Sequence, residues 1–329
     1  MILNTFHFES LASPTQFNLH HSLLAAGCQA VASAIQADFS DANLTLNEAD
    51  TLHLEYKHLL AALTQQHCPE VMPHTYFIDE LNYRNVVDHL KDGELHSLWI
   101  LKPSMLNNGT GIRLFASREG IGQHFQSSHR YDGPHVLQKY IANPHLLNGH
   151  KYTFRMFVVI TNWAGAYLFR HGYFNVGREP YQSSNIQHLQ SHLTNEHLTP
   201  NQQTPNVWQI PTARCPNFAL IYKKMQQIVT QTLSALCQEA PHLANSSPPI
   251  QAFSIFGYDF ILDDTLRLWL LEVNHGPCFP KTEPHLLKKH LYNEFWQEVV
   301  ATFVRPIMEK KAVSPSELFD IVFMRGQLL

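Results

Sequence analysis

The sequence predicts a mixed α/β or α+β fold, because apolar strand-like runs and amphipathic helical stretches alternate along its 329 residues. Hydrophobic residues make up 44% of the chain, including 20 Phe and 12 Tyr, so a sizeable core is available. The stretch YDFILDDTLRLWLLEVNH, residues 258–275, has two apolar runs around a short polar turn and predicts an antiparallel hairpin. A chain of this length has room for two domains or for one domain with subdomains.

Helices are expected where apolar side chains recur every three or four residues. Asn47 is a suitable N-cap for the second helix, since its side chain can accept a hydrogen bond from the first turn. The third helix is expected to end near Gly93. The expected helices span residues 20–37, 48–67, 84–96, about 217–238 and about 283–311.

Strands are expected in the short apolar runs between these helices. A segment rich in Pro, Gln and Asn, residues 199–216, predicts a long loop. The expected strands span residues 98–103, 135–141, 154–161 and 166–174, followed by the two strands of the hairpin.

The charge pattern argues against nucleic acid or a membrane as a partner. The formal net charge is −4, and no basic tract is long enough to wrap a polyanion. The N-terminus lacks the pattern of a secretory signal, and no apolar run is long enough to span a bilayer. Five scattered cysteines without a CxxC favour a reducing compartment over a disulfide framework or a thiolate zinc site. We therefore expect a cytoplasmic protein that acts as a monomer.

The hairpin carries three oxygen-bearing side chains among apolar ones. Glu272 and Asn274 are two residues apart, so they project from the same face of their strand. Asp259 lies on the paired strand and can approach them across the hairpin. Unpaired charges on an apolar wall are costly, and a hard cation such as Mg²⁺ prefers oxygen ligands. The alternatives are that Asp259 and Glu272 form salt bridges to Lys or Arg, or that Asn274 caps the following loop.

Two further stretches have residues suited to binding anions. In WILKPSMLNNGTGIRLF (99–115), Lys102 precedes a loop with Gly109 and Gly111, which could cradle phosphates or form an ordinary structural hairpin. In GHKYTFRMFVVI (149–160), alternate residues share one face of a strand, and a third cation follows on the next strand. That face could meet a phosphate or a carboxylate, or it could simply be solvated. Its polar residues are Lys151, Thr153 and Arg155, with Arg170 on the next strand.

The order of the motifs adds a resemblance to a known family. The series runs KPS…NNGTGI, VLQKYI, HKYTFR, YLFRHG, REPYQSSNIQ, SHLTNEHL, FGYDFILDD and WLLEVNHGP. From about Met72 to Pro277, roughly two thirds of the chain, this series resembles the tubulin–tyrosine ligase-like family, a branch of the ATP-grasp ligases.

The resemblance implies an ATP-grasp fold, in which two sheet-plus-helix subdomains clasp a nucleotide. Residues 71–141 would form the central subdomain with the glycine loop and the adenine linker, and residues 142–312 the C-terminal ATP-grasp subdomain with the metal site. Residues 1–70 would be a small helical N-terminal segment that diverges from the family, and residues 313–329 a C-terminal tail.

The resemblance also implies a role for each polar side chain. The Mg²⁺ ligands would be Asp259, Glu272 and Asn274, and the catalytic pair facing the γ-phosphate and the reacting carboxylate would be Arg155 and Arg170. Thr194 and Asn195 would line the acceptor or nucleotide side. ATP would be held by Lys102, Gly109, Gly111, Gln138, Lys139, Tyr140, Ile141, Lys151 and Thr153.

Such a ligase would use ATP and Mg²⁺ to convert a protein carboxylate to an acyl phosphate, which the amine of a free amino acid then attacks. Glutamylation, glycylation and tyrosination are the reactions that the resemblance implies, with tubulin as one possible acceptor. Two departures are visible: Thr153 stands where the family usually has a carboxylate, and Asn108 where the glycine loop often has a basic residue. The alternatives are a silent nucleotide-binding module and an ATP-grasp ligase for small peptides or metabolites.

Overall fold

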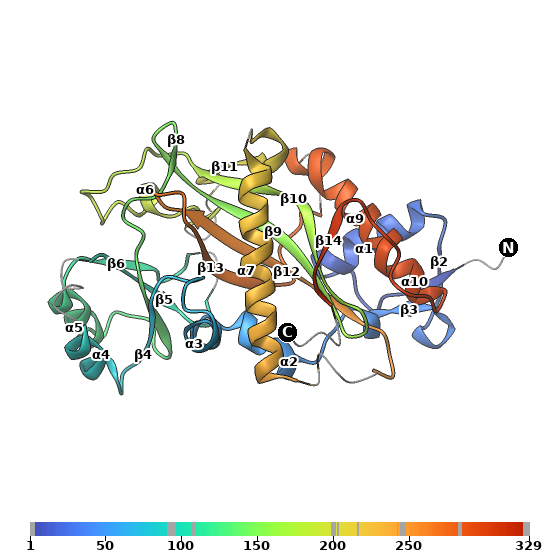
Figure 1. The fold of residues 1–329 in the computed structure, drawn as a ribbon, viewed down its shortest axis with the longest axis horizontal. Helices are drawn as coiled ribbons and strands as arrows, with labels where there is room; N and C mark the ends of the chain where they lie inside the picture. The colour runs from blue at the N-terminus through green and yellow to red at the C-terminus, as the bar shows by residue number, and fades with distance from the viewer. Residues whose placement is uncertain are drawn as a thin grey trace.

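A computed structural model of the chain describes residues 4–90, 97–106, 109–198, 202, 204–215, 217–241, 243, 248–281 and 285–324. Within these residues the strands form three sheets, flanked by helices (Figure 1). The fold is therefore mixed α/β, as expected. In the same residues, we find no helix with the length and apolar character needed to cross a membrane.

The largest sheet has seven strands in the order β11-β10-β9-β12-β13, with β8 added beside β9 and β14 beside β10. Its long strands are antiparallel, and β12 and β13 form the expected hairpin. The strands are β8 (Leu146–Leu147), β9 (His150–Thr161), β10 (Gly165–Gly177), β11 (Val207–Pro211), β12 (Phe253–Leu262), β13 (Leu268–His275) and β14 (Phe319–Met324).

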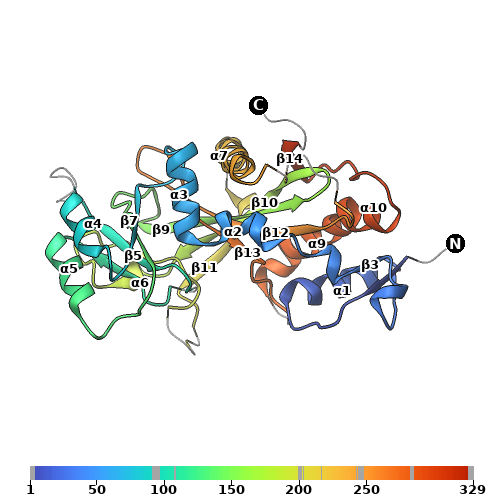
Figure 2. The ribbon, with the colours of Figure 1, turned by 90° about the horizontal axis from the view of Figure 1, so that it is seen from below.

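Both faces of this sheet are covered, because its strands alternate between two apolar cores. On β9, Phe154 and Met156 enter one core, whereas Phe157 and Val159 enter the other. Figure 2 shows the two layers of helices on opposite sides of the sheet. The first layer contains α2 (Glu48–Glu55), α3 (Lys57–His67) and α7 (Phe218–Glu239). The second contains α1 (Pro14–Ala25), α9 (Asn293–Val299) and α10 (Arg305–Met308), joined by π-helical turns at Lys288–Tyr292 and Val300–Val304.

A smaller antiparallel sheet lies to one side of the large one, at the left of Figure 1. Its strand order is β4-β7-β5-β6, and Trp99 and Leu101 are buried in its own core. The strands are β4 (Thr75–Ile78), β5 (Trp99–Pro103), β6 (Arg113–Phe115) and β7 (His135–Lys139), covered by α4 (Tyr83–His89) and α5 (Arg118–Gln126).

The N-terminal segment is not purely helical, which corrects the expectation for residues 1–70. The short strands β1 (Thr5–His7), β2 (Gln29–Ala30) and β3 (Phe39–Ser40) form a third, parallel sheet. The expected helix over 20–37 is also wrong, because α1 ends at Ala25. Gly27 then adopts φ +81°, a left-handed conformation that suits glycine and ends a helix.

Other boundaries depend on contacts that are distant in sequence. The helix expected at 48–67 breaks at Tyr56, whose ψ of 121° is extended, although Asn47 caps α2 as expected. The loop expected at 199–216 contains β11, and the expected tail contains β14; both strands pair with β10. The helix at 217–238 is confirmed as α7. The predicted end of the third helix at Gly93 lies outside the described residues.

Short helical turns complete the chain. They are 3₁₀ turns at Ala34–Gln36, Asp41–Asn43 and Thr212–Arg214, and the one-turn helix α6 (Leu189–His192).

Candidate functional site

A cavity of about 460 Å³ lies between the small sheet and the neighbouring end of the large sheet; we call it the cleft. The residues that the sequence nominated come together here, with Gly111 and Arg170 as the exceptions. Those lining the cleft are Lys102, Gly109, Gln138, Lys139, Tyr140, Ile141, Lys151, Thr153, Arg155, Thr194, Asn195, Asp259, Glu272 and Asn274.

The cleft begins where β9 leaves the helix-covered part of the sheet. Lys151, Thr153 and Arg155 share the face of β9 that continues as Phe157 in the core. The period-two alternation therefore places polar side chains in the cleft and apolar ones beneath the helices. The shared face predicted from sequence is confirmed by this arrangement.

Lys102 is buried in the wall formed by the small sheet. Its Nζ donates to Oε1 of Gln138 at 2.8 Å, and Nε2 of Gln138 donates to Oγ1 of Thr75 at 3.0 Å. Burial lowers the pKa of Lys102 to about 8, while the negative charge of Glu272 works against that shift. The ammonium is therefore held in place but poorly solvated, so an anion in the cleft would stabilise it.

Lys151 is the second buried cation of the cleft. Its Nζ donates to the hydroxyl of Tyr140 at 2.9 Å, and that hydroxyl lies 2.9 Å from Nδ1 of His192. Burial lowers the pKa of Lys151 to about 7, and the positive charge of Lys102 acts in the same direction. Two buried lysines with lowered pKa values in one cavity mark a candidate functional site.

The acidic end of the cleft is formed by the β12–β13 hairpin, where Asp259 lies directly opposite Glu272. The Nδ2 of Asn274 donates to Oδ2 of Asp259 at 3.2 Å and to Oε1 of Glu272 at 3.3 Å. Arg155 binds Asp259 with both ends of its fork, from Nε at 2.5 Å and Nη2 at 2.6 Å. The salt-bridge interpretation of the hairpin therefore applies to Asp259, and Glu272 faces cations of the opposite wall.

The pKa values of Asp259 and Glu272 are shifted in opposite directions. Burial raises the pKa of Asp259 to about 6, although the guanidinium of Arg155 opposes that shift. Burial would also raise the pKa of Glu272, but the positive charges of Lys57 and Lys102 outweigh it and bring that pKa to about 2. Glu272 is therefore ionised at any pH at which the protein would work.

The side chains at this end of the cleft are suited to Mg²⁺ that binds together with a nucleotide. Mg²⁺ is commonly held by one or two carboxylates together with substrate phosphates and water. Asp259 and Glu272 supply the carboxylates, and Asn274 supplies an amide oxygen. Within the described part of the chain, no three His, Cys, Asp or Glu side chains form a group able to hold a metal by themselves. Phosphate oxygens would therefore have to complete the coordination.

The glycine loop contributes only one of its two glycines to the cleft. Gly109 lines the cleft with φ +74°, and a Cβ at this position would lie 3.3 Å from Cγ of Asn195. Gly111 also has φ +74° but packs against Tyr131 on the other side of the loop. Of the two glycines expected to cover phosphates, Gly109 lines the cleft and Gly111 does not. Asn108 lies outside the described residues.

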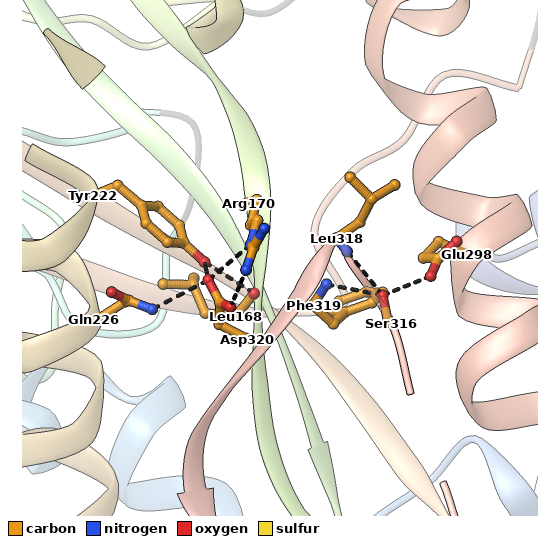
Figure 3. A network of polar contacts seen from close by, with 9 residues as sticks. All are labelled: Leu168, Arg170, Tyr222, Gln226, Glu298, Ser316, Leu318, Phe319 and Asp320. Carbon is orange, nitrogen blue, oxygen red and sulfur yellow. Dashed lines mark hydrogen bonds and ion pairs between the residues drawn. The ribbon is translucent and has the colours of Figure 1, made fainter. Parts of the chain in front are cut away.

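Arg170 is not part of the cleft, which corrects its assignment to the catalytic pair. Its guanidinium contacts the carboxylate of Asp320 on β14 (Figure 3), with Nη2 2.7 Å from Oδ1. The side chain of Arg170 is 49% exposed. Tyr222 and Gln226 of α7 donate to the same carboxylate at 2.8 and 3.2 Å. Arg170 therefore joins β10 to β14 and α7.

The alternation of side chains along β10 places Arg170 on the face away from the cleft. Leu168 and Phe174 enter the core beneath α7, whereas Phe169 and Tyr173 enter the other core, so the two-residue register shift between Leu168 and Gly172 leaves the faces unchanged. The residue of β10 opposite Thr153 is Asn175, and it lines the cleft. Arg170 and Asn175 are an odd number of residues apart, so they lie on opposite faces of β10.

Other cleft residues were not singled out from the sequence. Lys57, at the start of α3, donates from Nζ to the carbonyl of Leu106 at 2.9 Å. Its positive charge also lowers the pKa of Glu272. Its sequence context, an ordinary amphipathic helix, gave no signal of a site. The remaining lining residues are mainly aromatic and amidic. They include Tyr173, Asn175, Glu196, Gln209, Phe279 and Tyr292.

Comparison with known proteins adds independent information. The sequence model of the family described as "Tubulin-tyrosine ligase family" matches residues 43–312. "Probable tubulin polyglutamylase TTLL2" of Homo sapiens is 29% identical over 204 residues, which cover 56% of this chain and 32% of that protein. "Tubulin glycylase 3C" of Tetrahymena thermophila is 25% identical over 246 residues, covering 70% of this chain and 22% of that protein.

A third relative, "Inactive polyglycylase TTLL10" of Homo sapiens, is 27% identical over 246 residues, covering 64% of this chain and 35% of that protein. The chain thus spans between about a fifth and about a third of the length of these three relatives.

Proposed function

Because the chain belongs to the tubulin-tyrosine ligase family, we propose that it is an ATP- and Mg²⁺-dependent ligase that joins a free amino acid to a protein carboxylate. One observation carries the proposal: two buried lysines and the Asp259, Glu272 and Asn274 cluster line one cavity. Cations for phosphates and oxygen ligands for a divalent metal are the two requirements of phosphoryl transfer. The ATP-grasp-like fold of the family supports the same conclusion.

The reaction would proceed in two steps. The acceptor carboxylate attacks the γ-phosphorus of ATP, an oxygen–phosphorus bond forms, and ADP leaves as the bond to the γ-phosphoryl group breaks. The amine of the amino acid then attacks the acyl carbon, the new C–N bond forms, inorganic phosphate leaves and the amine loses a proton. Each step relocates negative charge, so positioning and charge neutralisation are the main contributions of the protein.

The residues of the cleft suit these contributions. Lys102 and Lys151 would contact the phosphates, with Gln138 and Tyr140 fixing the two ammonium groups. Arg155 would orient the reacting carboxylate or the γ-phosphoryl group from the face that Asp259 does not occupy. Bound Mg²⁺ would neutralise phosphate charge beside Asp259, Glu272 and Asn274.

The identities of the protein acceptor and of the donated amino acid are proposed from the relatives. The names of the relatives that we compared support a protein acceptor, with tubulin as the first to test, and glutamate or glycine as the donor. The scattered cysteines support a cytoplasmic location.

A silent nucleotide-binding module is the second candidate, and the chain offers a reason for it. Thr153 brings no charge to the cleft, and its hydroxyl lies 2.8 Å from that of Thr194. Asn175, the neighbouring position on β10, is also neutral. One of the relatives compared above carries the description "inactive". Nucleotide binding without amino-acid transfer would fit this arrangement.

Incubation with ATP, Mg²⁺, a pool of isotopically labelled amino acids and a cell lysate would separate the candidates. A ligase should attach a labelled amino acid to a protein, detected by mass spectrometry, and the Glu272→Gln variant should not. ATP binding without any transfer would favour the silent module. Absence of ATP binding by calorimetry at millimolar nucleotide would contradict both.

A further inference from the structure

A second cavity, of about 250 Å³, lies behind the glycine loop. We call it the basic pocket. Gly111 lines it, whereas Gly109, two residues earlier, lines the cleft, so the loop separates the two cavities. Its side chains come from β6, α5, β7 and the segment between α5 and β7. The lining residues are Gly111, Arg113, His124, His129, Arg130, Tyr131 and His135.

The lining is basic and includes no carboxylate among the described residues. Two guanidinium groups and three imidazoles contribute, and the nearest acids are already committed to one guanidinium. Arg130 lies 2.7 Å from Glu80 and 3.6 Å from Asp132. Arg113 forms no side-chain hydrogen bond or ion pair with any other residue that the structure describes. One cation of the pocket is therefore left for a ligand.

The histidines are arranged to respond to negative charge. The Nδ1 of His135 lies 2.8 Å from the carbonyl of Gly133, so Nδ1 carries the proton and Nε2 remains for another partner. Burial lowers the pKa of His124 to about 4, and the charges of Arg113, His135 and Arg130 act in the same direction. The neighbouring cations thus disfavour the charged form of His124, and a bound anion would oppose that effect.

We propose that the basic pocket binds a phosphate-type oxyanion, either inorganic phosphate or a phosphate monoester carried by another molecule. Its donors lie on separate elements around one cavity, which suits four tetrahedral oxygens better than the two coplanar oxygens of a carboxylate. A cation is excluded by the two arginines. The volume is about half that of the cleft, so a phosphate group with associated water fits.

The binding of inorganic phosphate can be followed by NMR through the ring C–H signals of the histidines. In the full-length protein, phosphate should shift the signals of His124 and His135 in a saturable manner and move their titration midpoints to higher pH. Besides burial, the charged groups that act on these two histidines are Arg113, Arg130 and Glu80. Phosphoserine in place of phosphate tests the monoester, and acetate tests whether any small anion is sufficient.

Two variants locate the site. Arg113→Gln removes the unpartnered, exposed cation and should weaken phosphate binding by about tenfold or more, since a charge-assisted hydrogen bond is lost. Arg118→Gln, on α5 but outside the pocket lining, is the matched control and should bind as the wild type does. Lys151→Met should also leave the histidine shifts intact, because Lys151 lies in the cleft.

Each outcome of these experiments either supports the phosphate site or contradicts it. Stronger binding of phosphoserine than of phosphate would identify a monoester as the ligand, and the reverse would identify free phosphate. Shifts lost in Lys151→Met but kept in Arg113→Gln would place phosphate in the cleft and overturn the proposal. Equal shifts with acetate, or none with either phosphate compound at tens of millimolar, would also overturn it.

Discussion

Arg155 and Asp259 lie directly opposite each other on the antiparallel strands β9 and β12, and the guanidinium binds the carboxylate through two hydrogen bonds. Their side chains are only 15% and 14% exposed. A buried pair of this kind fixes the direction of the guanidinium, and removing one partner leaves an uncompensated charge. Arg155 is therefore oriented before any substrate arrives.

The fork of Arg155 should be required for catalysis. Arg155→Lys keeps a positive charge for Asp259 but loses the planar, bidentate geometry. We expect amino-acid transfer to fall by about a hundredfold or more, and ATP affinity to fall by less than about tenfold. Transfer assays by mass spectrometry and calorimetry with ATP provide the two values. Wild-type transfer by this variant would show that Arg155 only supports the strand pairing.

The absence of a side chain at Gly257 should also be required for transfer, because it leaves room for Arg155. A Cβ at position 257 would lie 2.9 Å from Cδ of Arg155, so Gly257→Ala should displace that side chain. Transfer should decrease while the fold, followed by circular dichroism, is retained. Gly122→Ala is a suitable control, since a Cβ there meets nothing within 4 Å. Equal activity of the two variants would contradict this role for Gly257.

Glu272→Gln should separate metal binding from folding. The substitution keeps the shape of the side chain and removes the charge that faces Lys57 and Lys102. We expect a loss of transfer on the order of a hundredfold or more, with weaker Mg²⁺-dependent ATP binding. Calorimetry with ATP at several Mg²⁺ concentrations measures the second effect. A variant with normal Mg²⁺ dependence would mean that the metal binds elsewhere.

Arg170 and Asp320 should affect stability rather than chemistry. Arg170 is half exposed, so Arg170→Gln should cost no more than about 1 kcal/mol in the free energy of unfolding. Asp320→Ala should cost more, about 1–3 kcal/mol, because Tyr222 and Gln226 also lose their acceptor. Denaturant unfolding measures both. A large loss of transfer in Arg170→Gln, at unchanged stability, would restore Arg170 to the catalytic pair.

The buried lysines predict a specific dependence on pH. The pKa values of Lys151 and Lys102 lie near 7 and 8 in the folded protein, below the ordinary value of 10.5. The unfolded chain therefore binds more protons between about pH 7 and 10.5, so the free energy of unfolding should rise with pH through that window.

Nucleotide binding should reverse this shift, because phosphates favour the charged lysines. ATP binding at pH 8 should therefore take up protons, which calorimetry in buffers of different ionisation enthalpy detects. Lys151→Met should reduce the uptake. Binding without proton exchange in the wild type would contradict the placement of both lysines beside the phosphates.

Local rules predicted the parts of the site that lie on single strands or across one hairpin. Glu272 and Asn274 share a face because side chains alternate, and a short turn brings Asp259 opposite them. The sequence could not predict the neighbours of Arg170, since its partner Asp320 is 150 residues away. Lys57 was equally hidden, because only the packing of α3 beside the glycine loop brings it to the cleft.

The position of β14 has a consequence for how the chain is synthesised. One edge of β10 is shared by two partners: β11 covers the half from Tyr173 to Gly177, and β14 covers the half from Gly165 to Phe169. Until the last described strand leaves the ribosome, the second half of that edge has unpaired backbone groups beside apolar side chains. Such an edge can pair with another chain. Nascent or truncated chains that end before Phe319 should therefore depend on chaperones and aggregate more readily than chains that include β14.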